Sequence, residues 1–403
     1  MSTLDYVLSM ARAVMLAAAL ACSACALPSI PSYCSTWNPM EIECPINEDP
    51  MAIWDNLFQS KIFGQSLAGR AIHKALSRNI QKHSNYSKEN WNPYYVNMLS
   101  TFLVAYENPQ ALKARPLFMH FSGPTGVGKS LTADIVASSM FNRHNADNRL
   151  CGKFILQMRA YSSRNPFHLE KYEQDIRRKV GEQLSHCPRS VLIFDEIQSI
   201  SEQLLDSIIE IFDGSGPPLF FHPHPAPVNT SLCVVIVISD IGSTKLNPYM
   251  DREQAKQAVQ EDADKKFLLS KKRALLQNIV PFLPLTEEDF ASVAVKELKR
   301  LGEKLAIEYK GSWIGKLTWA KEVPRWIAKH CWSDATCVSD GGRGVETHID
   351  HDISTIIENA LMSECQNPES VSFNNIDLSI SSDGNSLVAK MDSVYSDSEF
   401  REL

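Results

Sequence analysis

The sequence lacks the surplus of positive charge that a nucleic-acid-binding surface needs. Its 403 residues contain 40 Lys and Arg against 47 Asp and Glu, a net charge of −7, which argues against nucleic acid as a partner. The ten cysteines show none of the spacings of a zinc site. A hydrophobic content of 44% suits a folded protein, and the length has room for two domains and tails.

The N-terminal apolar run, AVMLAAALACSACA, is shorter than the about 20 residues that a membrane-spanning helix needs. Arg12 is the only basic residue of residues 1–26, and Ala24-Cys25-Ala26 has the small residues of a cleavage site. We predict a secretory signal peptide over residues 1–26, with an uncleaved hydrophobic anchor as the alternative.

Cleavage after Ala26 would leave an even number of cysteines, which permits disulfides in an oxidising compartment. We predict a pair between Cys34 and Cys44, because their Pro-rich segment has little else to order it. Cys187 and Cys233 adjoin apolar runs and are predicted to be buried free thiols. Two glycosylation sequons also fit a lumenal protein: Asn85-Tyr86-Ser87 and Asn229-Thr230-Ser231.

A phosphate-binding pattern, G-x-x-x-x-G-K-[ST], lies between an apolar run and a stretch with helical spacing. A glycine-rich turn formed by chance would explain the glycines but not Lys129 and Ser130 at this offset. Lys129 is predicted to reach the outer phosphates of a nucleotide and Ser130 to hold Mg²⁺. The predicted loop consists of Gly123, Pro124, Thr125, Gly126, Val127, Gly128, Lys129 and Ser130.

Apolar runs that look like buried strands alternate with helical stretches from the first third of the chain onward. Strand and helix in this order predict an α/β fold, a parallel sheet with helices on both faces. The phosphate loop would then lie at the carboxyl edge of the sheet, where such folds bind ligands. The predicted strands after the first are Phe154–Met158, Val191–Phe194 and Leu232–Ile238.

The alternation stops after Pro281, where Thr286 and the acidic residues behind it form a helix N-cap signature. Residues 366–403 hold nine serines and seven acidic residues, which favours a disordered tail. We therefore predict a signal peptide (1–26), a linker (27–50), a large α/β nucleotide-binding domain (51–280), a small helical domain (281–365) and an acidic Ser-rich tail (366–403).

A second motif, SVLIFDEIQSI, is a hydrophobic strand that ends in two carboxylates. Asp195 is predicted to be the Mg²⁺ ligand, and Glu196 the base that takes a proton from the attacking water. Acidic residues are common at strand ends, but after a complete phosphate loop this pair indicates nucleotide hydrolysis.

Two further residues are candidates for the same site. Asp240 ends the next strand, where it would face the outermost phosphate; a solvent-facing carboxylate is the alternative, and its charge would slow the chemistry unless a cation compensates. Arg343 precedes a helical stretch in the second domain, where it could fold over the phosphates or remain a surface arginine.

Together these residues resemble the AAA+ superfamily and, within it, the torsin family of endoplasmic reticulum ATPases, relatives of the Clp-type disaggregases. The resemblance covers about Met51 to Glu364. Besides the phosphate loop, it depends on an adenine-covering segment, a Walker B strand, a torsin-like domain junction and a sensor 2 motif: Ile62–Gln65, Ser190–Glu196, Val280–Leu285 and Gly341–Arg343.

The resemblance implies an AAA+ fold, an ATP- and Mg²⁺-dependent hydrolase that acts on proteins, a homo- or hetero-oligomer, and a location in the lumen of the endoplasmic reticulum or nuclear envelope. Sensor 2 reads Gly-Gly-Arg instead of the torsin Gly-Cys-Lys, with Cys337 the nearest cysteine. Leu275 stands where Clp-type proteins place an arginine finger. Such an arginine is worth about 10³–10⁵ in rate, so a membrane-anchored lumenal activator is expected to supply one.

Two other functions remain open from the sequence. Asp240 and the missing finger favour a nucleotide-binding switch or scaffold with little hydrolysis. A nucleotide kinase fits the phosphate loop but not Asp195-Glu196 followed by a helical domain. We predict weak intrinsic ATPase activity that remodels protein or membrane assemblies.

Overall fold

The structure is a computed structural model that describes residues 44–84, 115–145, 147–162, 166–212, 219, 228, 230–266, 278–309, 315–364 and 373–393. The predicted signal peptide, residues 27–43 and both sequon asparagines lie outside these residues. No helix within the described ranges combines the length and apolarity needed to cross a membrane.

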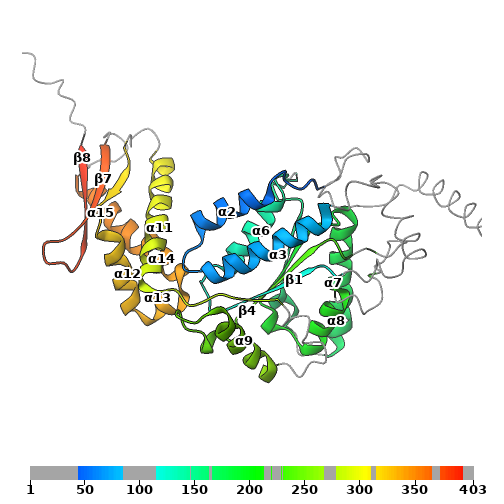
Figure 1. Cartoon of the computed structure of the whole chain (residues 1–403). Coiled ribbons are helices and arrows are strands. Elements are labelled where there is room, and N and C mark those ends of the chain that lie inside the picture. The colour runs from blue at the N-terminus through cyan, green and yellow to red at the C-terminus, as the bar shows by residue number, and fades with distance from the viewer. Residues whose placement is uncertain are drawn as a thin grey trace, which may run out of the picture.

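A five-stranded parallel sheet forms the centre of the larger part of the described chain (Figure 1). Its strands are β1 (Leu117–Ser122), β2 (Lys153–Gln157), β3 (Val191–Asp195), β4 (Val234–Ser239) and β5 (Ile279–Pro281). They lie in the order β2-β3-β4-β1-β5, so the strand before the phosphate loop is next to β4 and one strand away from β3. The predicted parallel α/β sheet is confirmed.

Helices cover both faces of the sheet, and they lie in two groups in Figure 1. One face packs on α2 (Pro50–Lys61), α3 (Ser66–Ser84) and α6 (Lys129–Met140), the other on α7 (Pro166–His186), α8 (Glu202–Phe212) and α9 (Arg252–Lys266). Successive strand residues point to opposite faces, so Phe121 joins the first core and Phe118 the second. Double coverage explains why the inner strands β3 and β4 are nearly continuous apolar runs.

The N-terminal helices begin and end at recognisable residues. Asp49 caps α2 by accepting a hydrogen bond from the backbone N–H of Ala52 at 3.0 Å. Gly64, with φ +69°, separates α2 from α3. The buried side chain of Gln65 bonds to both backbone groups of Leu283, donating to its carbonyl at 2.8 Å and accepting from its N–H at 3.0 Å.

Three short helical turns follow the carboxyl ends of consecutive strands. They are η3 (Met158–Tyr161) after β2, η4 (Ile197–Ser199) after β3 and η5 (Ser243–Lys245) after β4. Because these strands are neighbours and parallel, the turns meet at the edge of the sheet that carries the phosphate loop.

A smaller helical part lies beside the sheet (Figure 1). It contains α11 (Glu287–Glu308), α12 (Val323–Ser333), α13 (Ala335–Asp340), α14 (Gly342–His348), the π-helical turn η6 (Ile349–Ile353) and α15 (Ser354–Glu364). Helix α11 begins with the predicted N-cap: the Thr286 hydroxyl accepts from the N–H of Asp289 at 3.3 Å, and the Asp289 carboxylate accepts from the N–H of Thr286 at 2.9 Å.

The predicted disordered tail is wrong for residues 373–393. A second sheet is formed by β6 (Leu317–Trp319), β7 (Phe373–Ile380) and β8 (Leu387–Ser393), in which β7 is parallel to β6 and antiparallel to β8. Ile376, Leu378 and Leu387 are buried against the helices of the smaller part. Apolar side chains at alternate positions therefore fold this segment despite its serine and acidic content. Residues 366–372 and 394–403 lie outside the described chain.

The linker prediction is wrong for residues 44–49, which pack against the large domain. Ile46 forms an antiparallel bridge with Phe141, and the N–H of Asn47 donates to the carbonyl of Met140 at 2.8 Å. Cys44 forms a disulfide with Cys187, with the two Cα atoms 5.7 Å apart.

This disulfide overturns two predictions about cysteines. Cys44 does not pair with Cys34, and Cys187 is not a free thiol. The prediction for Cys233 is confirmed, because it is buried and free, and burial raises the pKa of its thiol. A second disulfide joins Cys331 on α12 to Cys337 on α13.

Candidate functional site

The predicted phosphate loop connects β1 to α6. Gly128, in the left-handed region at φ +95°, precedes Lys129, the first residue of α6, so the positive end of the helix points into the loop. The Lys129 ammonium donates to the carbonyl oxygens of Gly123, at 2.7 Å, and of Pro124.

The loop also contacts the smaller part of the molecule. The N–H of Gly342 donates to the carbonyl oxygen of Gly126 at 3.0 Å. A Cβ on Gly126, which has φ +73°, would collide with the backbone carbonyl of Asp340. Only glycine therefore permits this approach between the phosphate loop and the turn that carries Arg343.

Ser130 and the two carboxylates at the carboxyl end of β3 lie together at the edge of the sheet. The Ser130 hydroxyl donates to Asp195 Oδ2 at 3.3 Å, and the Gln157 amide is 3.5 Å from the same oxygen. Glu196 has φ +61°, a left-handed conformation that is strained for a residue with a side chain. Its carboxylate binds Arg159, with Arg159 Nε 2.7 Å from Oε2 and Nη2 3.0 Å from Oε1.

A cavity of about 370 Å³, within the usual range for ligand sites, joins these groups to the smaller part. Its lining brings together Lys129, Ser130, Asp195, Glu196, Asp240 and Arg343, as well as Thr125, Gly126, Val127 and Gly128. Gly123 and Pro124 contribute the carbonyls that accept from Lys129. The geometry is compatible with the predicted roles of these residues, which stay predictions.

The pKa of Lys129 is shifted by the burial of its side chain and by four neighbouring charged groups. Burial lowers the pKa of Lys129 from 10.5 to about 8, while Asp240 and Asp195 act in the opposite direction and Arg343 adds to the decrease. Asp240 Oδ1 is buried and accepts no hydrogen bond within the described part of the chain. A phosphate group next to Lys129 would therefore meet an ammonium that loses its proton more readily than that of a free lysine, and a carboxylate that repels it.

The lining of the cavity also includes apolar side chains from both parts of the molecule. They are Ile62 and Phe63, which follow α2, and Leu285 and Val293 from the smaller part. Ile62 and Phe63 belong to the segment that the resemblance assigned to covering the adenine. A lining that contains both apolar and charged side chains matches the chemistry of a nucleotide, which has a base and phosphates.

The residues fit a magnesium ion bound together with a nucleotide. Ser130 and Asp195 offer a hydroxyl and a carboxylate within hydrogen-bond distance of each other. Across the described ranges no group of three or more His, Cys, Asp or Glu side chains forms a metal cluster. Mg²⁺ needs none, because it is usually held by one or two protein oxygens together with substrate phosphates.

Arg159 is a residue of the cavity that sequence reasoning missed. It lies two residues beyond β2, and only the pairing of β2 with β3 brings it to Glu196. No local pattern in the sequence indicates that β2 pairs with β3. Leu275, which stands at the position of the arginine finger of Clp-type proteins, lies outside the described residues.

Comparison with known proteins gives matches of two related kinds. A family model described as Torsin matches residues 95–194. The chain is 26% identical to the chaperone protein ClpB of Chlamydia pneumoniae over 284 residues, which cover 67% of this chain and 31% of that protein. It is 24% identical to a torsin-like protein of Caenorhabditis elegans over 268 residues, 62% of this chain and 69% of that protein.

The parallel sheet, the phosphate loop and these matches define the fold as that of an AAA+ P-loop protein, and they support an AAA+ ATPase. Within this class the chain is similar to torsins as well as to ClpB. It spans about a third of the length of the bacterial ClpB protein.

Proposed function

We propose that this protein is a torsin-like ATPase that remodels protein or membrane assemblies in the lumen of the endoplasmic reticulum or nuclear envelope. The observation that carries the proposal is the convergence of Lys129, Asp195 and Glu196 with Arg343 of the smaller part on one cavity beside the phosphate loop. A triphosphate in this cavity would contact both parts of the molecule, so its hydrolysis would change how they meet.

Each residue has a chemical task in this proposal. Lys129 and the N–H groups at the start of α6 bind the phosphates, and Arg343 contacts them from the smaller part. Glu196 takes the proton of the attacking water. Mg²⁺, held by Ser130 and Asp195 with the phosphates, would neutralise part of their negative charge.

Hydrolysis is proposed to be weak until a membrane-anchored partner adds an arginine. Arg159 and Arg343 are the arginines that line the cavity in the described part of the chain, and Arg159 is occupied by Glu196. A transition-state charge would thus gain from a further guanidinium. The disulfides Cys44–Cys187 and Cys331–Cys337 support a lumenal location, because disulfides persist mainly in oxidising compartments.

Replacing the proposed base tests the proposal. Glu196→Gln keeps the size of the side chain but removes the proton acceptor, so turnover should fall by about 10²–10⁴ while ATP binding is retained. Lys129→Ala should instead lose ATP binding. The measurements are phosphate release and nucleotide affinity, each with and without the lumenal domain of a candidate activator. Unchanged turnover in Glu196→Gln would exclude this residue as the base.

The orphaned carboxylate oxygen of Asp240 favours a second function, a nucleotide-dependent switch that hardly hydrolyses. In that case charge repulsion at Asp240 limits the chemistry, and Asp240→Asn should raise turnover by about tenfold or more. Phosphate release at saturating ATP measures the effect. If turnover stays unchanged in Asp240→Asn while ATP still binds, repulsion at Asp240 does not limit the chemistry, and this argument for the switch function fails.

A further inference from the structure

The smaller part of the molecule contributes charged side chains of both signs to the cavity lining. Helix α11 supplies Lys296 and Glu297. Helix α14, which packs against α11, supplies Arg343 and Glu346. A carboxylate next to a nucleotide repels its phosphates and attracts the cations that bind them. The two glutamates therefore have to be compensated before the site can bind ATP well.

Arg300, one turn beyond Lys296 on α11, engages three carboxylates of the smaller part. Its Nε is 2.5 Å from Glu297 Oε2, and its Nη2 is 2.7 Å from Asp350 Oδ2 and 3.6 Å from Glu346 Oε1. The Glu297 side chain is only 6% exposed, and a carboxylate buried to this extent is strongly destabilising unless it is paired. Lys296 Nζ is 3.2 Å from its other oxygen. Arg300 thus compensates both glutamates of the lining.

The guanidinium of Arg343 takes part in no hydrogen bond and no ion pair among the described residues. Glu346 follows it three positions later on the same helix, α14. Side chains at this spacing lie on one face of a helix, and opposite charges there attract each other. The Glu346 carboxylate nevertheless lies next to Arg300. Arg343 is therefore available to a phosphate group because another arginine engages its neighbour.

We propose that Arg300 is a positioning residue that keeps the guanidinium of Arg343 free by holding Glu297 and Glu346. The inference deepens the proposed ATPase function and rests on it, because that function has Arg343 contact the phosphates. Without Arg300, Glu346 pairs with Arg343, and nucleotide binding has to break this pair. The carboxylates that Arg300 no longer neutralises repel the phosphates as well.

A network that only joined helices would behave differently. Arg300 also connects α11 to the π-helical turn η6 through Asp350, so its loss lowers stability whatever happens to ATP binding. If this were its whole role, neutralising Glu346 could not restore the ATP affinity of a variant that lacks Arg300. The positioning role predicts that it does restore the affinity, because Arg343 is then free again.

Replacement of Arg300 by glutamine separates the two roles. Gln can still donate a hydrogen bond to Glu297 but carries no charge. Arg300→Gln should weaken ATP affinity about fivefold, as expected when a partly exposed ion pair competes with binding. Adding Glu346→Gln should return the affinity to within about twofold of the wild type. Calorimetry measures the affinities, and thermal unfolding measures the stability of each variant.

Two further comparisons test whether the charge of Arg300 acts through Arg343. Arg300→Lys keeps the charge, so its ATP affinity should stay within about twofold of the wild type. Arg343→Ala should itself weaken ATP binding about tenfold or more, because it removes a charge-assisted contact to phosphate. In that background Arg300→Gln should change the affinity by less than about twofold, since the residue that it affects is absent.

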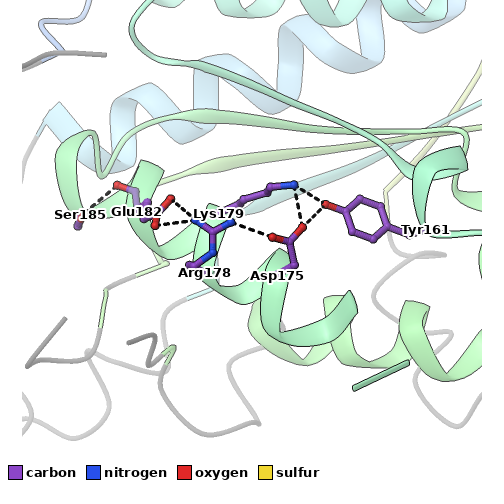
Figure 2. Close-up of polar contacts among 6 residues, drawn as sticks. All are labelled: Tyr161, Asp175, Arg178, Lys179, Glu182 and Ser185. Atoms are coloured by element: carbon purple, nitrogen blue, oxygen red, sulfur yellow. Dashed lines mark hydrogen bonds and ion pairs between the residues drawn. The ribbon is translucent and has the colours of Figure 1, made fainter. Parts of the chain in front are cut away.

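Arg178→Ala on α7 is the matched control. Arg178 also binds two carboxylates, those of Asp175 and Glu182, as Figure 2 shows. Its side chain is 45% exposed, close to the 39% of Arg300, but α7 contributes no residue to the described lining of the cavity. Loss of this network should leave ATP affinity at the wild-type value.

The binding measurements decide the inference separately from turnover. Wild-type affinity in Arg300→Gln would overturn the positioning role, and so would a loss that Glu346→Gln does not restore. Either result leaves the proposed function in place if the wild type hydrolyses ATP. A wild type that binds ATP but never hydrolyses it refutes the proposed function, while the affinities of the variants still test Arg300. A folded wild type without measurable ATP binding would overturn both.

Discussion

Lys129 is a partly buried cation that faces three carboxylates and one arginine. Burial lowers its pKa to about 8, so the side chain loses its proton in the mildly alkaline range in the free protein. The phosphates of ATP would stabilise the ammonium form and raise the pKa again. Binding at high pH therefore has to include the uptake of a proton.

ATP affinity should consequently fall as the pH rises through about 8. The loss should approach tenfold per pH unit above the pKa of free Lys129, because each unit leaves a tenth as much ammonium. Calorimetry at pH 7 and at pH 9, in two buffers of different ionisation enthalpy, would measure both the affinity and the proton taken up.

Lys129→Arg serves as the control for this pH dependence. A guanidinium stays charged throughout the range, so the variant should bind ATP with an affinity that hardly changes between the two pH values, although the longer side chain weakens binding overall. Equal affinities of the wild type at pH 7 and pH 9 would contradict the role of Lys129 in binding phosphate.

At the scale of single elements, the second sheet ties the C-terminal segment to the smaller part. Leu378 on β7 is 1% exposed, whereas Asp377 beside it points to solvent. Leu378→Ala should lower the free energy of unfolding by about 2–5 kcal/mol, because it leaves a cavity in the core. Asp377→Ala should change it by less than about 0.5 kcal/mol. Urea unfolding of both variants checks this, and equal stabilities would mean that β7 does not pack in solution.

The elements that could be predicted from sequence are those whose signal is local. Motif spacing locates the phosphate loop and Asp195-Glu196, and long apolar runs locate the strands of the first sheet. The alternation of Ile376, Leu378 and Ile380 with polar residues was a strand pattern as well. The serine and acidic composition nevertheless predicts disorder for this segment. No local signal indicates that it has a partner strand, because β6 lies more than fifty residues earlier in the chain.

Contacts across the sheet could not be predicted in the same way. Cys44 and Cys187 are separated by 143 residues and meet only when residues 44–49 pack beside the large domain. Arg159 meets Glu196 because β2 happens to neighbour β3, and strand order is a property of the whole fold. The sequence motifs therefore locate the residues of the candidate site but not Arg159, which binds Glu196.

At the scale of the whole molecule, Gly126 is one of the residues through which the phosphate loop touches the smaller part. Gly126→Ala should weaken ATP binding at least about tenfold, because the new Cβ pushes the carbonyl of Asp340 and the Arg343 turn away from the loop. Nucleotide affinity of the purified variant is the measurement.

Gly384 provides a matched control for Gly126→Ala. Its φ of +75° is nearly the same as the +73° of Gly126, yet a Cβ there would meet nothing within 4 Å. Gly384→Ala therefore introduces similar backbone strain without a collision, and ATP affinity should stay at the wild-type value. Equal losses in the two variants would attribute the effect to strain and not to the contact between the two parts.

The two hydrogen bonds between Gln65 and Leu283 limit where the molecule can pivot. They fasten the chain to the large domain up to Leu283, and α11 begins at Glu287. Any swing of the smaller part must then turn about the three residues between them, Pro284 to Thr286. With its 22 residues α11 is a lever about 33 Å long, so a rotation of about 10° would carry its far end about 6 Å.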